Sequence, residues 1–231
     1  MEGKTKFIGP AFLIGILLLA GCASKDRGAK TPDKVKATPT DQTKAKLIKQ
    51  LDGKFEDPDA HFELGRMYQA DGMWTQAEYY YNNALSFDPS HRGAQAGMVK
   101  VLADSGDKTK SALTADIYIN QVSASAEESL LLALAFQKQL LDDYALTCYR
   151  QALRLAPNSA RINRQIGYYY LSKNDKVLAQ EYLTRSFQLN SNQPDVAGEL
   201  GRMGVAVRIP QKTQTNTKKL DKIVEQSDKQ R

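Results

Sequence analysis

Cysteine and histidine are scarce in this chain of 231 residues, which contains two of each. Neither Cys22 nor Cys148 has another cysteine or a histidine at a spacing typical of metal ligands. If Cys22 is modified, a single thiol remains, and it cannot form an intramolecular disulfide. We therefore expect no metal site, and we expect Cys148 to be a small buried hydrophobic residue.

The motifs of common enzyme classes are also absent. The sequence has no glycine-rich phosphate loop, no nucleophile elbow and no zinc-protease helix. The acidic pairs Glu127-Glu128 and Asp142-Asp143 occur where we expect a helix start and a turn, and carboxylates stabilise the backbone at such positions. We therefore expect no catalytic activity, no cofactor and no small-molecule substrate. A carboxylate site without a recognised motif is the enzymatic alternative.

Long apolar runs are missing except near the N-terminus. Lys4 and Lys6 precede an apolar stretch over residues 7–20, which contains a proline. This stretch is shorter than the ~20 residues that a membrane-spanning helix requires. A basic head, a short apolar stretch and small residues before a cleavage point are typical of a secretory signal peptide. We therefore predict a signal peptide over residues 1–21.

The predicted cleavage point resembles a bacterial lipobox, because Leu19, Ala20 and Gly21 stand directly before Cys22. The resemblance implies that Cys22 is acylated, for example with palmitate, by more than one chain, as a stable anchor requires. No aspartate follows to retain the protein at an inner membrane. We therefore expect a lipid-anchored protein of the bacterial cell envelope, at the outer membrane and facing the periplasm. An ordinary signal peptide with a chance cysteine is the alternative.

Positive charge is concentrated in the two terminal segments. The net charge is +6, yet residues 50–207 contain fifteen Lys and Arg against nineteen Asp and Glu. Residues 22–49 are polar, so we expect a disordered linker after the lipidated cysteine, with a short helix between Thr40-Asp41 and Gly53. Residues 208–231 form a basic tail that we also expect to be disordered. Such tails attract anionic lipid or an acidic partner, or are simply solvated. No nucleic-acid recognition motif is present, so we expect no nucleic-acid partner.

The most informative feature is a pattern that recurs every 34 residues. Four copies cover residues 58–91, 92–125, 126–159 and 160–193, and a truncated fifth begins at 194. Large apolar and small residues recur at the same offsets. They are Leu64, Gly65, Tyr68, Ala77, Tyr81, Ala84 and Pro89 in the first copy, and Leu132, Ala133, Phe136, Ala145, Tyr149, Ala152 and Pro157 in the third. The pattern resembles the tetratricopeptide repeat (TPR), whose stacked helical hairpins bury a core between neighbouring repeats.

The resemblance predicts an all-α, TPR-type helical-hairpin solenoid over residues 50–207, with a C-terminal capping helix over 194–207. The second copy is the weak one. Val99, Ala115 and Tyr118 occupy positions at which the family favours a small residue, an aromatic residue and a small residue. The internal register of this copy is either that of its neighbours or offset by one residue.

In this family the first helices of the repeats line a concave groove that binds a protein or peptide. The resemblance implies that positions 2, 5, 9 and 12 of each copy face the groove. Such a surface suits an extended or helical peptide, since apolar side chains supply affinity and arginines orient carboxylates. The alternative is packing against a flanking segment, such as the chain's own tail. The candidate groove residues are Phe62, Arg66, Gln69, Leu130, Leu134, Gln137, Arg161, Arg164, Tyr168 and Leu171.

A lipobox followed by repeats resembles the lipoproteins that assist Flp/Tad-type and type IV pilus assembly. We therefore expect a membrane-anchored scaffold for protein–protein interaction in the assembly of an envelope complex, either a pilus or a secretion apparatus. A periplasmic adaptor that delivers substrates to an envelope protease or a cell-wall hydrolase is the alternative.

Overall fold

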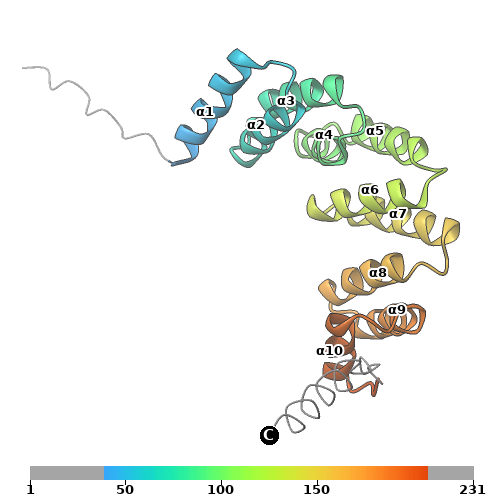
Figure 1. Cartoon of the computed structure of the whole chain (residues 1–231). Coiled ribbons are helices and arrows are strands. Elements are labelled where there is room, and N and C mark those ends of the chain that lie inside the picture. Colours follow the sequence, from blue (N-terminus) through green and yellow to red (C-terminus); the bar gives the residue numbers. More distant parts are fainter. Residues whose placement is uncertain (1–38, 208–231) are drawn as a thin grey trace, which may run out of the picture. The chain divides into compact units, whose positions relative to one another are not determined.

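The computed structural model describes residues 39–207, so the expected signal peptide, Cys22 and the basic tail lie outside the described residues. Between residues 39 and 207 all regular structure is α-helical, as the repeat pattern predicts (Figure 1). No helix of this part combines the length and the apolar character that crossing a bilayer requires. The helices are α1 (Pro39–Gly53), α2 (Pro58–Ala70), α3 (Trp74–Phe87), α4 (Arg92–Asp104), α5 (Lys108–Gln121), α6 (Ala126–Lys138), α7 (Asp142–Leu155), α8 (Ala160–Ser172), α9 (Lys176–Leu189) and α10 (Pro194–Arg202).

Helices α2 to α9 form four hairpins of one length. In every hairpin the first helix has 13 residues and the second has 14. The two helices of each hairpin pack on each other, and α4 also packs on α2, α3 and α6. Helices α4 and α5 begin at the same offsets as their counterparts in the other copies. The second copy is therefore not shifted by one residue.

Large and small residues are paired across the hairpins. The Tyr81 ring of α3 lies against Gly65 of α2, and the same offsets pair a leucine with a glycine in the fourth hairpin. In the second hairpin the sizes are exchanged, because Val99 stands on α4 and Ala115 on α5, both fully buried in one cluster. This exchange conserves packing volume, which explains how the second copy departs from the family pattern and keeps its register.

The turn inside each hairpin has a residue with a positive φ at the same offset. These residues are Gly72 (72°), Gly106 (99°), Leu140 (58°) and Asn174 (59°). Glycine adopts this left-handed conformation freely and asparagine tolerates it, whereas leucine does so at a cost of about 1–2 kcal/mol. The Leu140 side chain is 75% exposed, so burial does not offset that cost.

The N-terminal helix begins at Pro39, next to the expected start at Thr40-Asp41. A disordered linker over residues 22–49 is wrong for its last part, because α1 begins at Pro39. Leu51 of α1 is buried against Ala60 and Leu64 of α2. These apolar contacts stabilise the helix in spite of the polar composition of the segment.

The C-terminal capping helix is shorter than the expected range of 194–207. Helix α10 ends at Arg202, because Gly204 has a φ of 81° and the Val205 N–H donates to the Leu200 carbonyl at 2.9 Å. Hydrogen bonds of this kind close a helix at its C-terminus. The apolar face of α10 packs on α9 and covers the end of the core.

Candidate partner-binding groove

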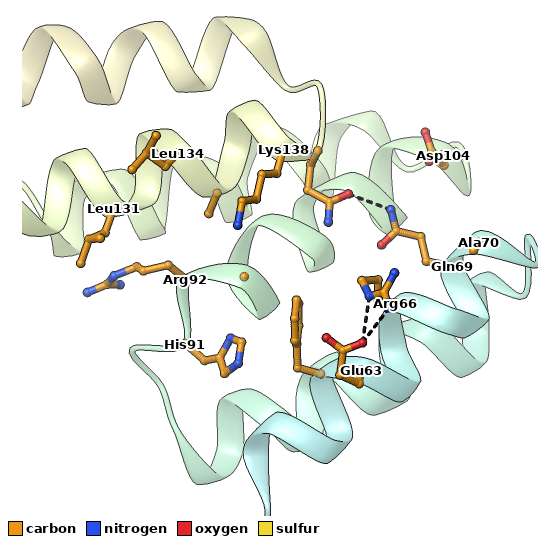
Figure 2. Close-up of a pocket in the computed structure, with 14 residues that line it drawn as sticks. Glu63, Arg66, Gln69, Ala70, His91, Arg92, Asp104, Leu131, Leu134 and Lys138 are labelled. Atoms are coloured by element: carbon orange, nitrogen blue, oxygen red, sulfur yellow. Dashed lines mark hydrogen bonds and ion pairs between the residues drawn. The ribbon is translucent and has the colours of Figure 1, made fainter. Parts of the chain in front are cut away.

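A groove of about 850 Å³ is bounded by α2, α4, α6 and the turn after α6 (Figure 2). This volume falls in the range of about 300–1,000 Å³ that is usual for ligand pockets. Apolar side chains and backbone form much of its surface. They belong to Phe62, Ala70, Gly93, Leu131, Leu134 and Ala135.

Phe62 lies over the first turn of α4. A Cβ atom at Gly93 would stand 2.9 Å from Cζ of Phe62, so a glycine is what leaves room for the ring. The centroid of the His91 ring is 4.6 Å from that of Phe62. His91 Nδ1 accepts the N–H of Ala94 at 3.0 Å, which leaves Nε2 as the donor facing Asp59 at 3.3 Å. Phe62 is thus held between the backbone of α4 and a fixed imidazole ring.

The side-chain amide of Gln69 closes the turn end of the groove. It accepts a hydrogen bond of 2.5 Å from the Tyr81 hydroxyl. It also donates one of 2.9 Å to the Gln139 side-chain oxygen, which is the dashed line at Gln69 in Figure 2. The first and third hairpins are therefore linked directly. In the third hairpin Gln137 accepts the equivalent bond from Tyr149 and does not line the groove. Burial raises the pKa of both tyrosines, so both hydroxyls remain donors at neutral pH.

Two arginines at the groove are held by carboxylates of the chain. Arg66 donates to Glu63 at 2.8 Å on the same face of α2. Arg92 of α4 donates two hydrogen bonds, of 2.8 and 3.1 Å, to one oxygen of Glu128 on α6. The second pair joins the second hairpin to the third beside the groove, and both pairs fix the direction of a guanidinium.

Lys138 of α6, unlike these arginines, is not paired with a carboxylate of residues 39–207. The carboxylate of Asp104, which also lines the groove, accepts a hydrogen bond of 2.6 Å from Lys100 instead. Lys138 lines the groove and is exposed, and among residues 39–207 it has no ion-pair partner. Its side chain extends from α6 into the open groove (Figure 2).

The structure brings four of the ten predicted groove residues together, and it contradicts the assignment of Leu130. Leu130 is 2% exposed and belongs to the core, whereas the next residue, Leu131, lines the groove. Consecutive residues of a helix differ by about 100° in direction, so in this turn of α6 Leu131 faces the groove in place of Leu130, whereas Leu134 faces it as expected. The predicted residues that do line the groove are Phe62, Arg66, Gln69 and Leu134.

The predicted residues of α8 lie apart from this groove. Arg161 is 3.3 Å from Glu127 of α6, and Arg164 is 3.8 Å from Asp195 of α10. Tyr168 donates a hydrogen bond of 3.1 Å to the same aspartate. Burial, together with that aspartate, raises the pKa of Tyr168 to about 12. The polar groups of α8 are thus directed at neighbouring helices.

Sequence reasoning missed Leu131, Lys138 and Arg92 as groove residues. Leu131 and Lys138 stand three residues before and four residues after Leu134, a spacing that places all three on one side of α6. That spacing is a usable signal. Arg92 carries no such signal, because its position depends on how α4 packs on α6. Leu171 of α8 is half-buried and lies outside the groove.

The side chains that line the groove provide apolar surface, hydrogen-bonding groups and charge for a ligand. Between residues 39 and 207 no group of three or more His, Cys, Asp or Glu side chains is arranged to hold a metal ion. Cys148 is fully buried, as predicted, and burial raises the pKa of its thiol to about 12. A thiol with that pKa is protonated at neutral pH and is a poor nucleophile.

Comparison with known proteins agrees with the repeat pattern. Residues 58–91 match the family described as tetratricopeptide repeat. The chain is 28% identical over 158 residues to the type IV pilus assembly protein PilF of Pseudomonas aeruginosa, a match that covers 66% of this chain and 62% of PilF. It is 25% identical over 145 residues to the human protein O-mannosyl-transferase TMTC1, covering 60% of this chain and 16% of TMTC1. The chain thus spans less than two thirds of either relative.

A solved structure of P. aeruginosa PilF is 25% identical in sequence and has a TM-score of 0.37, covering 66% of this chain and 71% of the other. The chain thus has an all-α fold of the TPR-type hairpin-solenoid class, one of its four hairpins matches the tetratricopeptide-repeat family, and its sequence is similar to that of PilF.

Proposed function

We propose that this protein is a membrane-anchored scaffold for protein–protein interaction, and that it acts in the assembly of a pilus or secretion apparatus in the bacterial envelope. The observation that carries the proposal is the groove between α2, α4 and α6, where Phe62 and Leu134 offer apolar surface beside charged groups. The similarity to a protein named for type IV pilus assembly supports the choice of process.

The groove has the composition of a recognition surface. Aromatic and aliphatic anchors that are ringed by polar groups contribute most of the free energy at protein interfaces. Gln69 is held by Tyr81, and Arg66 by Glu63. Side chains that are already ordered lose little conformational entropy when a partner binds, which favours affinity.

Acylation of Cys22 supplies the anchor in this proposal. More than one acyl chain holds a protein stably, because each buried methylene contributes about 0.8 kcal/mol. We place the protein at the outer membrane, facing the periplasm, where the anchor raises the local concentration of the scaffold around a membrane-bound partner. A second contact region, apart from the groove, is proposed to consist of Gln137, Arg161, Arg164, Tyr168 and Leu171.

Site-specific photo-crosslinking in living cells tests the proposal. A photoreactive amino acid replaces Leu134 in the groove, Arg161 on α8, or Val177, which is 79% exposed on α9. We expect the probe at Leu134 to capture a component of a pilus or secretion apparatus, identified by mass spectrometry, and the probe at Val177 to capture none. Capture at Arg161 would extend the surface to α8.

Two outcomes contradict the proposal. Equal capture of the same component from Leu134 and Val177 would mean that the groove is not the binding surface. Capture from Leu134 of an envelope protease or a cell-wall hydrolase, with no pilus or secretion component, would instead identify an adaptor. Thermal unfolding of each variant checks that the hairpins are intact.

A further inference from the structure

The carboxylates that line the groove have ion-pair partners within the chain, whereas its lysine has none among residues 39–207. Its two carboxylates, Glu63 and Asp104, are paired with Arg66 and Lys100 at 2.8 and 2.6 Å. Their negative charge is therefore largely neutralised at short range. What the groove has left to offer a ligand is positive charge and apolar surface.

Lys138 is the main source of that positive charge. It is exposed, extends into the groove (Figure 2) and has no ion-pair partner among residues 39–207. It stands one turn of α6 beyond Leu134, which contributes to the apolar lining. One turn of a helix is about 5.4 Å, so a single ligand residue can reach the leucine while its neighbour reaches the lysine.

We propose that the groove binds a peptide segment in which apolar side chains alternate with Asp or Glu, and that Lys138 pairs with one of those side-chain carboxylates. This inference rests on the proposed function and specifies the partner of the same groove. The apolar side chains contact Phe62, Leu131 and Leu134, where they replace water. The carboxylate selects among apolar segments by charge complementarity.

The chain's own C-terminal segment fits this groove poorly. Residues 208–231 contain seven Lys and Arg against three Asp and Glu. A basic segment would place like charge against Lys138, which is unfavourable. Charge therefore favours a partner from another protein over the chain's own tail.

Binding of defined peptides to the purified full chain tests the inference. The probes are short fluorescent peptides with both ends blocked, so that only side chains carry charge. One alternates leucine with glutamate, a second replaces each glutamate by lysine, and a third replaces each leucine by serine. We expect the leucine–glutamate probe to bind about five-fold or more tightly than either of the others, with the preference falling as salt is raised.

Charge reversal at the lysine supplies the decisive comparison. In Lys138→Glu we expect the preference for glutamate over lysine to vanish or to invert, a gain that unfolding cannot produce. The matched control is Lys176→Glu, since Lys176 is exposed at the start of α9, away from the groove. This variant should behave as the unaltered protein, and both variants should keep the unaltered melting temperature within a few degrees.

Several results would overturn the inference. They are equal binding of the glutamate and lysine probes, equal binding of the leucine and serine probes, a preference that Lys138→Glu leaves unchanged, and no binding of any probe. The proposed function is judged separately by capture from Leu134. If the probe at Leu134 captures an assembly component but none of the three peptides binds, the proposed function stands and the proposed acidic ligand is wrong.

Discussion

Gly65 and Tyr81 face each other so closely across the first hairpin that a Cβ atom at Gly65 would lie 2.7 Å from Cδ1 of the tyrosine ring. The same ring also lies against Gly97 of the second hairpin. Its hydroxyl then donates to Gln69 at the turn end of the groove. One buried tyrosine therefore joins the packing of two hairpins to a wall of the groove.

Gly65→Ala should destabilise the protein. Alanine favours a helix over glycine by about 1 kcal/mol, but the added methyl overlaps the Tyr81 ring, and overpacking costs about 1–3 kcal/mol. We expect a net loss of about 1–2 kcal/mol in the free energy of unfolding, measured by urea denaturation. In Gly198→Ala the new Cβ meets nothing within 4 Å, so this control should be stabilised instead. A loss of stability in both variants would contradict the packing explanation.

Leu140→Asn should stabilise the protein. Leu140 has a φ of 58° and is 75% exposed, and Asn174 has nearly the same φ at the same offset. Asparagine tolerates this conformation better than leucine, so we expect a gain on the order of 0.5–1 kcal/mol in unfolding free energy. The reverse exchange, Asn174→Leu, should cost a similar amount. Thermal unfolding of both variants measures the two effects, and equal signs would disprove the backbone argument.

Stability should fall as the pH rises above about 10, the usual pKa of tyrosine. Burial, with smaller contributions from Tyr169 and Cys148, raises the pKa of Tyr149 in the folded protein. The folded state therefore binds more protons than the unfolded state in this range, so the unfolding free energy decreases with pH. Urea denaturation at about pH 8 and about pH 10.5 measures the slope. Tyr149→Phe should reduce that slope, although losing the bond to Gln137 lowers stability at both pH values.

The hairpins could be predicted from the sequence because their packing repeats. Each copy places a small residue on one helix opposite a large residue on the other. Because this pairing recurs every 34 residues, it fixes where the two helices of each copy lie along the sequence. The second copy was ambiguous because Val99 and Ala115 exchange the large and the small position. A volume exchange across two helices is visible only when both helices are placed.

The groove was only partly predictable. Leu130 and Leu131 are identical side chains in neighbouring positions, and only the packing of α6 on its neighbours decides which one faces the core. Arg164 and Tyr168 are directed at Asp195 of α10, which lies in the truncated fifth copy. A repeat pattern predicts the contacts between complete copies. It does not predict the contacts of the fourth copy with α10, because α10 belongs to a truncated copy.

Cys22→Ser should release the protein from the membrane. Serine cannot be acylated in the way that the lipobox resemblance implies for Cys22. Without acyl chains, each of whose buried methylenes contributes about 0.8 kcal/mol, we expect the variant in the soluble fraction after lysis, measured by immunoblotting. Cys148→Ala is the control, since Cys148 is buried in the folded part and should not affect anchoring. If the Cys22→Ser protein stays with the membrane, the anchor is not a lipid on this cysteine. If it is released while the probe at Leu134 still captures its component, anchoring and recognition are separate properties of the chain.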